Sequence, residues 1–322
     1  MSVLVYTESE NGVFKKGALE VASYAKGVAD LLGTSVTAIS INGGASDELG
    51  LYGVEKVLEV KEDKLTAFNA KAYASVIQQA VQQEGAKVVI ISSSADSKFI
   101  APLLSVYLTA GYVSNVVALP ESTSPIKVKR TAFTNKAFNS TEISSDVKLI
   151  GLSNNAYGLK ENSVTVSSEG FTPSLSDEDF GVQIESVDKA TDKVSIADAE
   201  IVVSGGRGLK GPENWGLIEE LADVLGAATA CSKPVSDMGW RPHAEHVGQT
   251  GKPVASNLYI AIGVSGAIQH LAGINASKVK VVINNDPEAP FFKAADYGIV
   301  GDAFEVVPKL IEKLKEFKSN NA

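Results

Sequence analysis

Residues 201–211 read IVVSGGRGLKG and decide the fold of the second half of the chain. The apolar run from Ile201 to Ser204 is typical of a buried parallel strand, and the glycines that follow form a G-x-G-x-x-G turn. A helical pattern from about Asn214 to Leu225 comes next. Strand, glycine turn and helix in this order predict an α/β unit whose turn amides and helix N-terminus contact a pyrophosphate.

The same turn lacks one part of a nicotinamide site. A dinucleotide fingerprint also has an acidic residue about 20 positions further on, which binds the ribose, and Ala227 to Cys231 offers none. Glycines needed only for close packing of strand and helix are the simplest alternative. Arg207 favours a ligand, because a guanidinium between two glycines has little use in packing but binds phosphate oxygens through two bonds.

Further patterns continue the alternation toward the end of the chain. Strands are expected at Tyr259 to Ile262 and at Val279 to Ile283, with a helix from Gly266 and a closing helix from about Phe304 to Phe317. The segment from Gly263 to His270 is a second turn between strand and helix, again with small residues. Two such turns in one domain suit a diphosphate ligand.

The first half of the chain shows the same rhythm. Strand-like runs at Val3 to Tyr6, Ser35 to Ile41 and Val88 to Ile91 alternate with helical patterns, which predicts a mostly parallel sheet. Later runs such as Ile126 to Phe133 and Ser145 to Leu152 have no helix between them, so we expect antiparallel strands appended to that sheet.

A polar stretch separates the two halves. Residues 167–199 are rich in Ser, Asp, Glu and Thr, with one strand candidate at Val182 to Val187. A length of 322 residues also favours two domains. We therefore expect an N-terminal α/β domain with a mostly parallel sheet at residues 1–190, and a Rossmann-like α/β domain at residues 199–322.

Charge and composition argue against several classes of partner. The chain has 29 Lys and Arg against 38 Asp and Glu, a formal net charge of −9, and no long basic run, so nucleic acid is not expected. Cys231 is the only cysteine, which excludes an internal disulfide and fits a reducing compartment. The longest apolar run, Leu258 to Ile274, is too short and too polar to span a membrane. With no export signal at its start, the sequence predicts a cytoplasmic bacterial protein.

A hydrolase is an alternative for the second turn. Gly263-x-Ser265 lies between strand and helix as a nucleophile elbow does, but Ala267 replaces the second glycine. His270 is the only histidine after Ser265, no acid lies between them, and a base on the same helix cannot reach that serine in the usual order. Hydrolysis is therefore disfavoured.

Two other features have simple structural explanations. His243 and His246, with the single cysteine, suggest a metal site, but no fourth ligand stands at an established spacing, so surface histidines and no metal are expected. Asp286 is expected to cap a helix that begins at Pro287. This leaves Asn284, at the end of a buried strand, to face the edge where such sheets bind ligands.

Four segments taken together resemble one known family. They are Ser204-Gly-Gly-Arg-Gly, Val247-Gly-Gln-Thr-Gly-Lys, Gly263-Val-Ser-Gly-Ala-Ile-Gln-His-Leu and Asn284-Asn-Asp-Pro-Glu-Ala-Pro, in this order. The chain resembles the alpha subunit of electron-transfer flavoproteins, most densely from about Ile201 to Leu310. The resemblance implies that the C-terminal domain holds FAD, that the first domain faces a beta subunit, and that the chain is an electron carrier rather than an enzyme.

The resemblance also implies which residues contact FAD. They are Arg207, Ser232, Lys233, Val247, Gly248, Gln249, Thr250, Ser265, Gly266, Ala267, Ile268, Gln269, His270, Asn284, Asp302 and Ala303. His270 would donate near N1 and the C2 carbonyl of the ring, where negative charge develops on reduction. Thr250 would lie near N5 and Gln249 near the ribityl chain. Arg207, Ser265 and Asn284 would hold the diphosphate region, and Asp302 would face the AMP end.

Two departures from the family pattern are expected to matter. Lys233 stands where the family usually has arginine, which keeps the charge but loses the planar fork, so a different flavin potential is expected. In the first domain, Phe133-Thr-Asn-Lys-Ala replaces the usual Tyr-Ala-Gly-Asn segment, which predicts a specialised partner interface.

The family passes electrons from acyl-CoA dehydrogenases or similar flavoprotein dehydrogenases to a membrane quinone reductase, and the resemblance implies the same role here. The alternative is a nicotinamide-dependent oxidoreductase that uses the same turns, which the missing ribose acid disfavours. A nucleotide sensor without redox chemistry is disfavoured because Thr250 and His270 would have no ring to contact. Whether the beta subunit carries AMP or a second FAD depends on that other chain.

Overall fold

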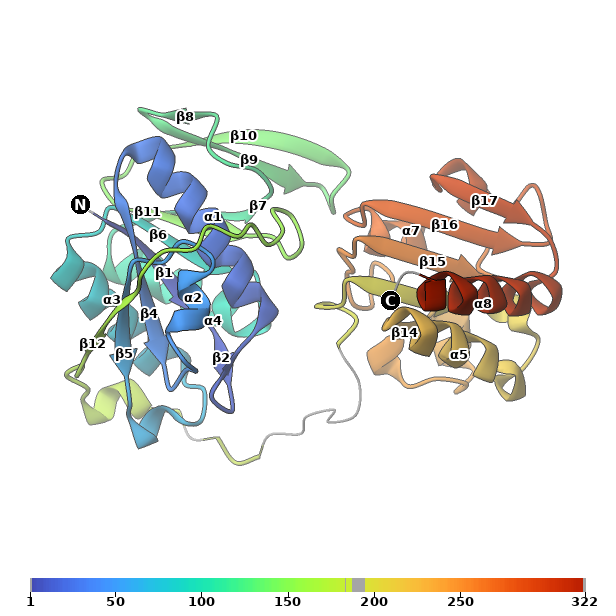
Figure 1. The fold of residues 1–322 in the computed structure, drawn as a ribbon, viewed down its shortest axis with the longest axis horizontal. Helices are drawn as coiled ribbons and strands as arrows, with labels where there is room; N and C mark the ends of the chain where they lie inside the picture. Colours follow the sequence, from blue (N-terminus) through green and yellow to red (C-terminus); the bar gives the residue numbers. More distant parts are fainter. Residues whose placement is uncertain (1, 183, 187–194, 321–322) are drawn as a thin grey trace. The chain divides into compact units, whose positions relative to one another are not determined.

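The computed structural model describes residues 2–182, 184–186 and 195–320. The chain forms two compact units, one of residues 1–132 with 137–188 and one of residues 133–136 with 189–322 (Figure 1). The expected boundary, between residues 190 and 199, lies partly outside the described residues. Each unit is an α/β structure, which confirms the expected fold class.

The first unit is built on one large sheet. Its strand order is β10-β9-β7-β11-β6-β1-β4-β5-β12, with β8 paired to β9, and a small hairpin of β2 and β3 lies outside it. The strands are β1 (Ser2–Thr7), β2 (Ser9–Glu10), β3 (Val13–Phe14), β4 (Ser35–Ile41), β5 (Lys56–Val60), β6 (Val88–Ser92), β7 (Gly111–Val116), β8 (Ser122–Thr123), β9 (Ile126–Ala132), β10 (Ala137–Ile143), β11 (Lys148–Leu152) and β12 (Ser167–Gly170). From β7 to β12 the neighbours pair in parallel.

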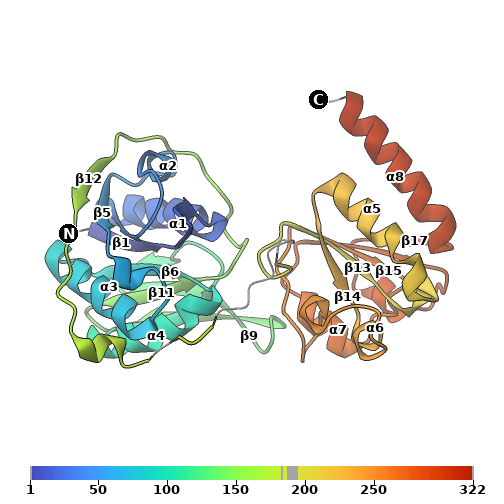
Figure 2. The ribbon, with the colours of Figure 1, turned by 90° about the horizontal axis from the view of Figure 1, so that it is seen from below.

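Helices cover both faces of this sheet. They are α1 (Lys16–Leu32), α2 (Asp47–Gly50), α3 (Ala70–Glu84) and α4 (Ala95–Tyr107), with 3-10 turns η1 (Asp63–Leu65) and η2 (Asp177–Phe180). Alternate residues of β1 point to opposite sides: Val3 and Val5 pack with α1, whereas Leu4 and Tyr6 pack with α3 and α4. Figure 2 shows α1 on one side of the sheet and α3 and α4 on the other. Burial on both faces explains the continuous apolar runs of these strands.

One expectation for the first unit is wrong, and the parallel strands β5 and β12 were not predicted. β9 and β10 form the expected antiparallel edge, with Val128 opposite Thr141. β11, however, is parallel and lies inside the sheet between β6 and β7. β12 pairs in parallel with β5, although its residues were expected to be part of the linker. The strand candidate from Val182 to Val187 falls partly outside the described residues, and residues 184–186 are not in a strand.

Within residues 195–320, five parallel strands form the second sheet. They are β13 (Ile201–Gly205), β14 (Ala228–Cys231), β15 (Leu258–Ile262), β16 (Val279–Asn284) and β17 (Tyr297–Val300). Their order is β14-β13-β15-β16-β17, so the chain runs outward in one direction from β13 to β14 and then in the other from β15. In such doubly wound sheets, ligands bind at the carboxyl edge near the point where the direction changes, here between β13 and β15.

The helices of the second unit also form two layers. They are α5 (Gly216–Leu225), α6 (Lys233–Asp237), α7 (Ile268–Ile274) and α8 (Ala303–Asn320), with 3-10 turns η3 (Arg207–Leu209), η4 (Pro212–Asn214), η5 (His243–Glu245) and η6 (Pro290–Lys293). Val203 and Ile283 pack with α5 and α8, whereas Val202 and Tyr259 pack with α7. Figure 2 shows α5 and α8 on one face and α6 and α7 on the other.

Candidate cofactor site at the carboxyl edge of the second sheet

The predicted site residues lie at the carboxyl edge of the second sheet. They follow successive strands: Arg207 after β13, Ser232 and Lys233 after β14, Ser265 to His270 after β15, Asn284 at the end of β16, and Asp302 and Ala303 after β17. Because parallel strands end at the same edge, residues far apart in the sequence meet there. The structure thus brings the predicted set together within one unit.

The first glycine turn ties the ends of β13 and β15 together. Gly206 N donates to Ile262 O at 2.9 Å, and Gly208 N donates to Gly263 O at 3.0 Å. A Cβ on Gly206 would lie 2.1 Å from the Gly263 oxygen. The prediction that these amides contact a pyrophosphate is therefore wrong. No α-helix starts at the turn either, because α5 begins only at Gly216.

The turn after β15 instead presents backbone amides without protein acceptors. In the part of the chain that the structure describes, none of the N–H groups from Ser265 to Gln269 donates to another protein group. Gly266 has a φ of 86°, and a Cβ there would lie 2.4 Å from the Phe291 nitrogen, so the turn needs glycine. Consecutive unpaired N–H groups of this kind fit the oxygens of a diphosphate.

Residues Val247–Thr250, here called the cofactor loop, reach the same edge from another direction. Val247 N donates to Cys231 O at 3.0 Å, and Gln249 N donates to Gln269 O at 2.7 Å. These bonds join the cofactor loop to the end of β14 and the start of α7. Val247 and Gly248 are buried, whereas the side chains of Gln249 and Thr250 are exposed at the edge. Both side chains are thus available to a ligand.

His270 is buried beside the cofactor loop. Its Nε2 lies 3.0 Å from the Tyr259 hydroxyl, and its Nδ1 has no hydrogen-bond partner among the described residues. The pKa of His270 is lowered to about 4, mainly by burial and also by nearby His246, with the Val247 backbone acting in the opposite direction. A neutral ring that accepts from Tyr259 carries its proton on Nδ1. Such an unpaired donor fits an acceptor on a bound ring, as predicted for FAD.

Tyr259 was not predicted as part of the site. It was expected only as a strand residue, and its side chain is fully buried under α7. Burial raises the pKa of its hydroxyl. The hydroxyl therefore keeps its proton and fixes the orientation of the His270 ring. A buried Tyr on the α7 side of β15 was the one available signal, because a buried Tyr hydroxyl usually has a partner.

Asn284 does not point freely at the edge. Its Nδ2 donates to Val264 O at 3.0 Å, and its Oδ1 accepts from Asp286 N at 3.0 Å. It therefore holds the turns after β15 and β16 together. The expected helix at Pro287 is also wrong, because Asp286 Oδ1 accepts from Glu288 N in a local turn and the next 3-10 turn begins only at Pro290.

Asp302 caps α8, with its Oδ1 accepting from Phe304 N at 2.9 Å. Its other oxygen lies 3.8 Å from Lys210 Nζ, and that ammonium lies 4.8 Å from the centre of the Phe304 ring. Ala303 is buried in the first turn of the helix. Lys210, which was not predicted, thus stands with Asp302 at this end of the edge.

Two further cationic side chains follow β13 and β14. Arg207 and Lys233 are exposed, whereas Ser232 is buried and its N donates to Gly205 O at 3.0 Å. Positive charge at the same sheet edge as the unpaired amides of Ser265 to Gln269 favours an anionic ligand.

The expectations for the other histidines are partly wrong. His243 is exposed, as expected of a surface histidine, but His246 is only 1% exposed. Among the described residues, no group of three or more His, Cys, Asp or Glu could hold a metal ion. His246 is therefore a buried residue of this loop.

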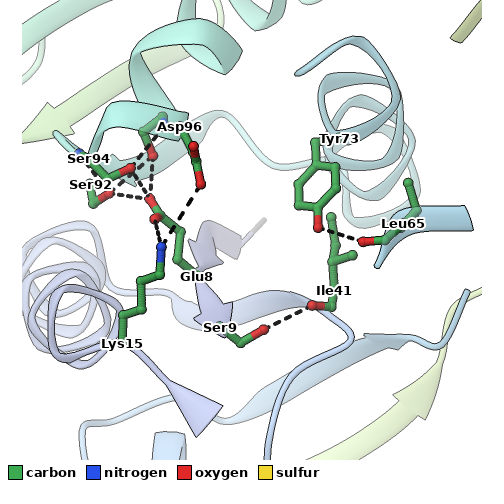
Figure 3. Close-up of polar contacts among 10 residues, drawn as sticks. Glu8, Ser9, Lys15, Ile41, Leu65, Tyr73, Ser92, Ser94 and Asp96 are labelled. Atoms are coloured by element: carbon green, nitrogen blue, oxygen red, sulfur yellow. Dashed lines mark hydrogen bonds and ion pairs between the residues drawn. The ribbon is translucent and has the colours of Figure 1, made fainter. Parts of the chain in front are cut away.

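The carboxyl edge of the first sheet is different, because a protein carboxylate lies there at the start of α4 (Figure 3). Glu8 follows β1, and its Oε1 accepts from the hydroxyls of Ser92 at 2.5 Å, Ser94 at 2.5 Å and Ser97 at 2.7 Å. Lys15 Nζ lies 3.5 Å from Oε2. Because Ser94 caps α4, the carboxylate occupies the place at a helix start that favours an anion. This charge disfavours a phosphate at that edge.

Two family models match the chain. The one described as "Electron transfer flavoprotein domain" matches residues 3–174, and "Electron transfer flavoprotein FAD-binding domain" matches residues 195–275. The "Electron transfer flavoprotein subunit alpha" of Bacillus subtilis (strain 168) is 40% identical over 289 residues, which cover 89% of this chain and 86% of that protein. The chain belongs to the electron transfer flavoprotein alpha subunits.

Other alpha subunits match over nearly their whole length. That of Thermoanaerobacterium thermosaccharolyticum is 33% identical and covers 98% of each chain. That of Paracoccus denitrificans is 35% identical and covers 98% of this chain and all of its own. The family resemblance predicted from the sequence is therefore confirmed.

Membership of the electron transfer flavoproteins establishes the broad role. FAD is the cofactor, in agreement with the description of the domain matched at residues 195–275. The chain is an electron carrier rather than an enzyme, and its family implies a beta subunit as partner. Among the described residues, the helices are too short or too polar to cross a membrane.

Proposed function

We propose that this alpha subunit binds FAD at the carboxyl edge of the β13–β17 sheet. The observation that carries the proposal is the run of unpaired amides from Ser265 to Gln269 beside the unpaired Nδ1 of His270. Residues 199–322 are the FAD-binding domain in this proposal, and residues 1–190 face the beta subunit. The Glu8 carboxylate at the start of α4 supports this division, since its negative charge disfavours a phosphate there.

In this proposal, different residues of the edge contact different parts of FAD. Arg207 and the amides from Ser265 to Gln269 bind the diphosphate, and Asn284 fixes the turn that presents these amides. Asp302 lies toward the AMP end. Gln249 and Thr250 extend along the ribityl chain toward the ring. The remaining predicted residues, Ser232, Lys233, Val247, Gly248 and Ala303, shape the edge around them.

At the ring, this chain supplies a placed proton donor. FAD, when bound, supplies the electron transfer itself. With its proton on Nδ1, His270 would donate toward the ring position where negative charge develops, and the Tyr259 hydroxyl, 3.0 Å from Nε2, would hold the imidazole in that orientation. Burial excludes water from this donor and so strengthens its electrostatic effect.

Electrons reach this carrier, in our proposal, from acyl-CoA dehydrogenases or similar flavoprotein dehydrogenases of fatty acid β-oxidation, and leave it to a membrane quinone reductase. The support is membership of the family and the absence of a ribose acid for a nicotinamide after β14.

The first experiment is an absorbance spectrum of the chain co-purified with its beta subunit, recorded during stepwise dithionite reduction. We expect flavin bands that bleach and return on reoxidation. An acyl-CoA dehydrogenase with its substrate should produce the same bleaching. A complex that takes up no FAD would contradict the proposal. If the complex binds FAD but the acyl-CoA dehydrogenase does not reduce it, only the proposed electron donor is wrong.

A variant tests the placement of the diphosphate. Arg207→Met should weaken FAD binding about tenfold, because it removes a charge-assisted contact to phosphate. Lys309→Met, which removes an exposed cation from α8, serves as the control and should bind FAD as the unmodified chain does. Equal FAD affinities for the two variants would show that Arg207 does not contact the diphosphate.

A further inference from the structure

The three histidines of the sequence gather around the cofactor loop. His243 begins η5, His246 follows it directly before Val247, and His270 lies on α7. The ring centroids of His243 and His246 are 5.2 Å apart. His246 is 1% exposed and His270 is 6% exposed, so two buried imidazoles lie against one loop.

The His246 ring supports the backbone of that loop. A Cβ on Gly251 would lie 2.9 Å from the His246 Cγ, and a Cβ on Gly248 would lie 3.3 Å from its Nε2. The His246 carbonyl accepts from Lys252 N at 2.9 Å, which closes the turn around the ring. A Cβ on Gly251 would also lie 2.4 Å from the His246 carbonyl oxygen, so the loop passes close to both the backbone and the ring of His246.

A positive charge on His246 would be costly in this position. Burial is the main cause of the lowered pKa of His246; His243 and Lys233 lower it further, and Asp237 raises it. His246 also opposes protonation of His270. The Nδ1 of His246 has no hydrogen-bond partner among the described residues, so a proton added there gains no compensating acceptor.

We propose that His246 is a positioning residue whose neutral imidazole holds the cofactor loop in the shape that binds FAD, and that protonation of this ring displaces the loop. This role rests on the proposed FAD site: His246 determines the lowest pH at which that site holds FAD. A charged ring must regain water, and the backbone from Gly248 to Gly251 is what has to move. Gln249 and Thr250 move with it, so acid releases the cofactor.

The test measures FAD retention by the complex of alpha and beta subunits, from flavin fluorescence between about pH 7.5 and about pH 5. The unmodified complex should bind FAD about tenfold more weakly at the acid end. His246→Gln should bind it about tenfold more weakly already at the neutral end and show a nearly flat pH profile.

His243→Gln is the matched control, because it removes an exposed histidine three residues away. It should keep the neutral affinity and shift FAD release to higher pH, since a group that opposes the charge on His246 is lost. A His246→Gln complex that matches the unmodified one in FAD affinity or in pH profile overturns the proposal. A complex that never binds FAD would contradict the proposed function instead.

If His246→Gln does not assemble, the unmodified complex still decides the question. Histidine-labelled alpha subunit with an unlabelled beta subunit has only three histidine ring signals to follow by NMR. The His246 ring should take up its proton at the pH where FAD is released. A ring that stays neutral throughout FAD release overturns the proposal.

Discussion

At the scale of single residues, the buried Glu8 carboxylate accepts hydrogen bonds from several groups at the carboxyl edge of the first sheet. Its side chain accepts from three serine hydroxyls and lies 3.5 Å from the Lys15 ammonium. Glu8→Ala removes the acceptor that the three hydroxyls share, so it should lower the free energy of unfolding of the first unit by about 2–4 kcal/mol. Thermal unfolding followed by circular dichroism measures this loss.

Glu161→Gln is the control for that change, because Glu161 is exposed in the same unit and its charge is solvated. It should leave the transition unchanged. Both tryptophans, Trp215 and Trp240, lie in the second unit, so their fluorescence shows whether the damage stays within the first. Equal transitions for the two variants would mean that the Glu8 contacts add no net stability.

The sequence predicted where site residues lie better than what they touch. Strand patterns alone place Arg207, Ser265 and Asn284 after parallel strands, and hence at one edge. The bonds of Asn284 to Val264 and Asp286 depend on how two turns meet, which no local pattern contains. The burial of His246 likewise depends on the path of the glycine loop around it.

At the scale of elements, the crossing of two turns holds the second sheet's edge together. Gly263 has a φ of 63°, and a Cβ there would lie 2.8 Å from the Gly208 Cα. Alanine at this position is therefore disfavoured both by the backbone conformation and by the close contact. Gly263→Ala should lower the free energy of unfolding of the second unit by about 2 kcal/mol or more. Urea unfolding followed by tryptophan fluorescence provides the measurement.

Gly216 offers a matched control for Gly263. It opens α5, and a Cβ there meets nothing within 4 Å. Gly216→Ala should leave stability unchanged or raise it slightly, because alanine favours helix. If both alanine variants unfold at the same urea concentration, the turn crossing is not a source of strain.

Elements with regular periodicity were predicted well, and strand partners were not. The strands near Val3, Ser35 and Val88 lie close to their predicted positions because buried parallel strands have continuous apolar runs. The apolar pattern of the β11 sequence does not show whether this strand lies at the edge of the sheet or between two other strands. Its place between β6 and β7 follows from a long-range crossover, which short windows of sequence do not record.

At the scale of the whole molecule, the two α/β units use their carboxyl edges in opposite ways. The first fills the start of α4 with the Glu8 carboxylate, whereas the second leaves the amides from Ser265 to Gln269 unpaired beside Arg207. A shared architecture therefore does not imply a shared ligand, and the charge placed at each edge decides which unit binds an anion.

Burial of His270 also makes the second unit sensitive to acid. Its pKa is about 4 in the folded chain, against about 6.5 for an unfolded histidine. Between these values the unfolded chain binds more protons, so stability is fully present above about pH 6.5 and falls by roughly 3 kcal/mol as the pH drops to about 4. His246, whose pKa burial also lowers, acts in the same direction.

The cofactor-free chain tests this directly. His270→Gln keeps a polar group near Tyr259 but cannot titrate, so the difference in stability between about pH 7 and about pH 4.5 should shrink by roughly 2–3 kcal/mol relative to the unmodified chain. Urea unfolding followed by the fluorescence of Trp215 and Trp240 gives both values. Carboxylates titrate equally in the two proteins and cancel in the comparison. An unchanged pH dependence in His270→Gln would mean that the folded chain does not keep this histidine neutral.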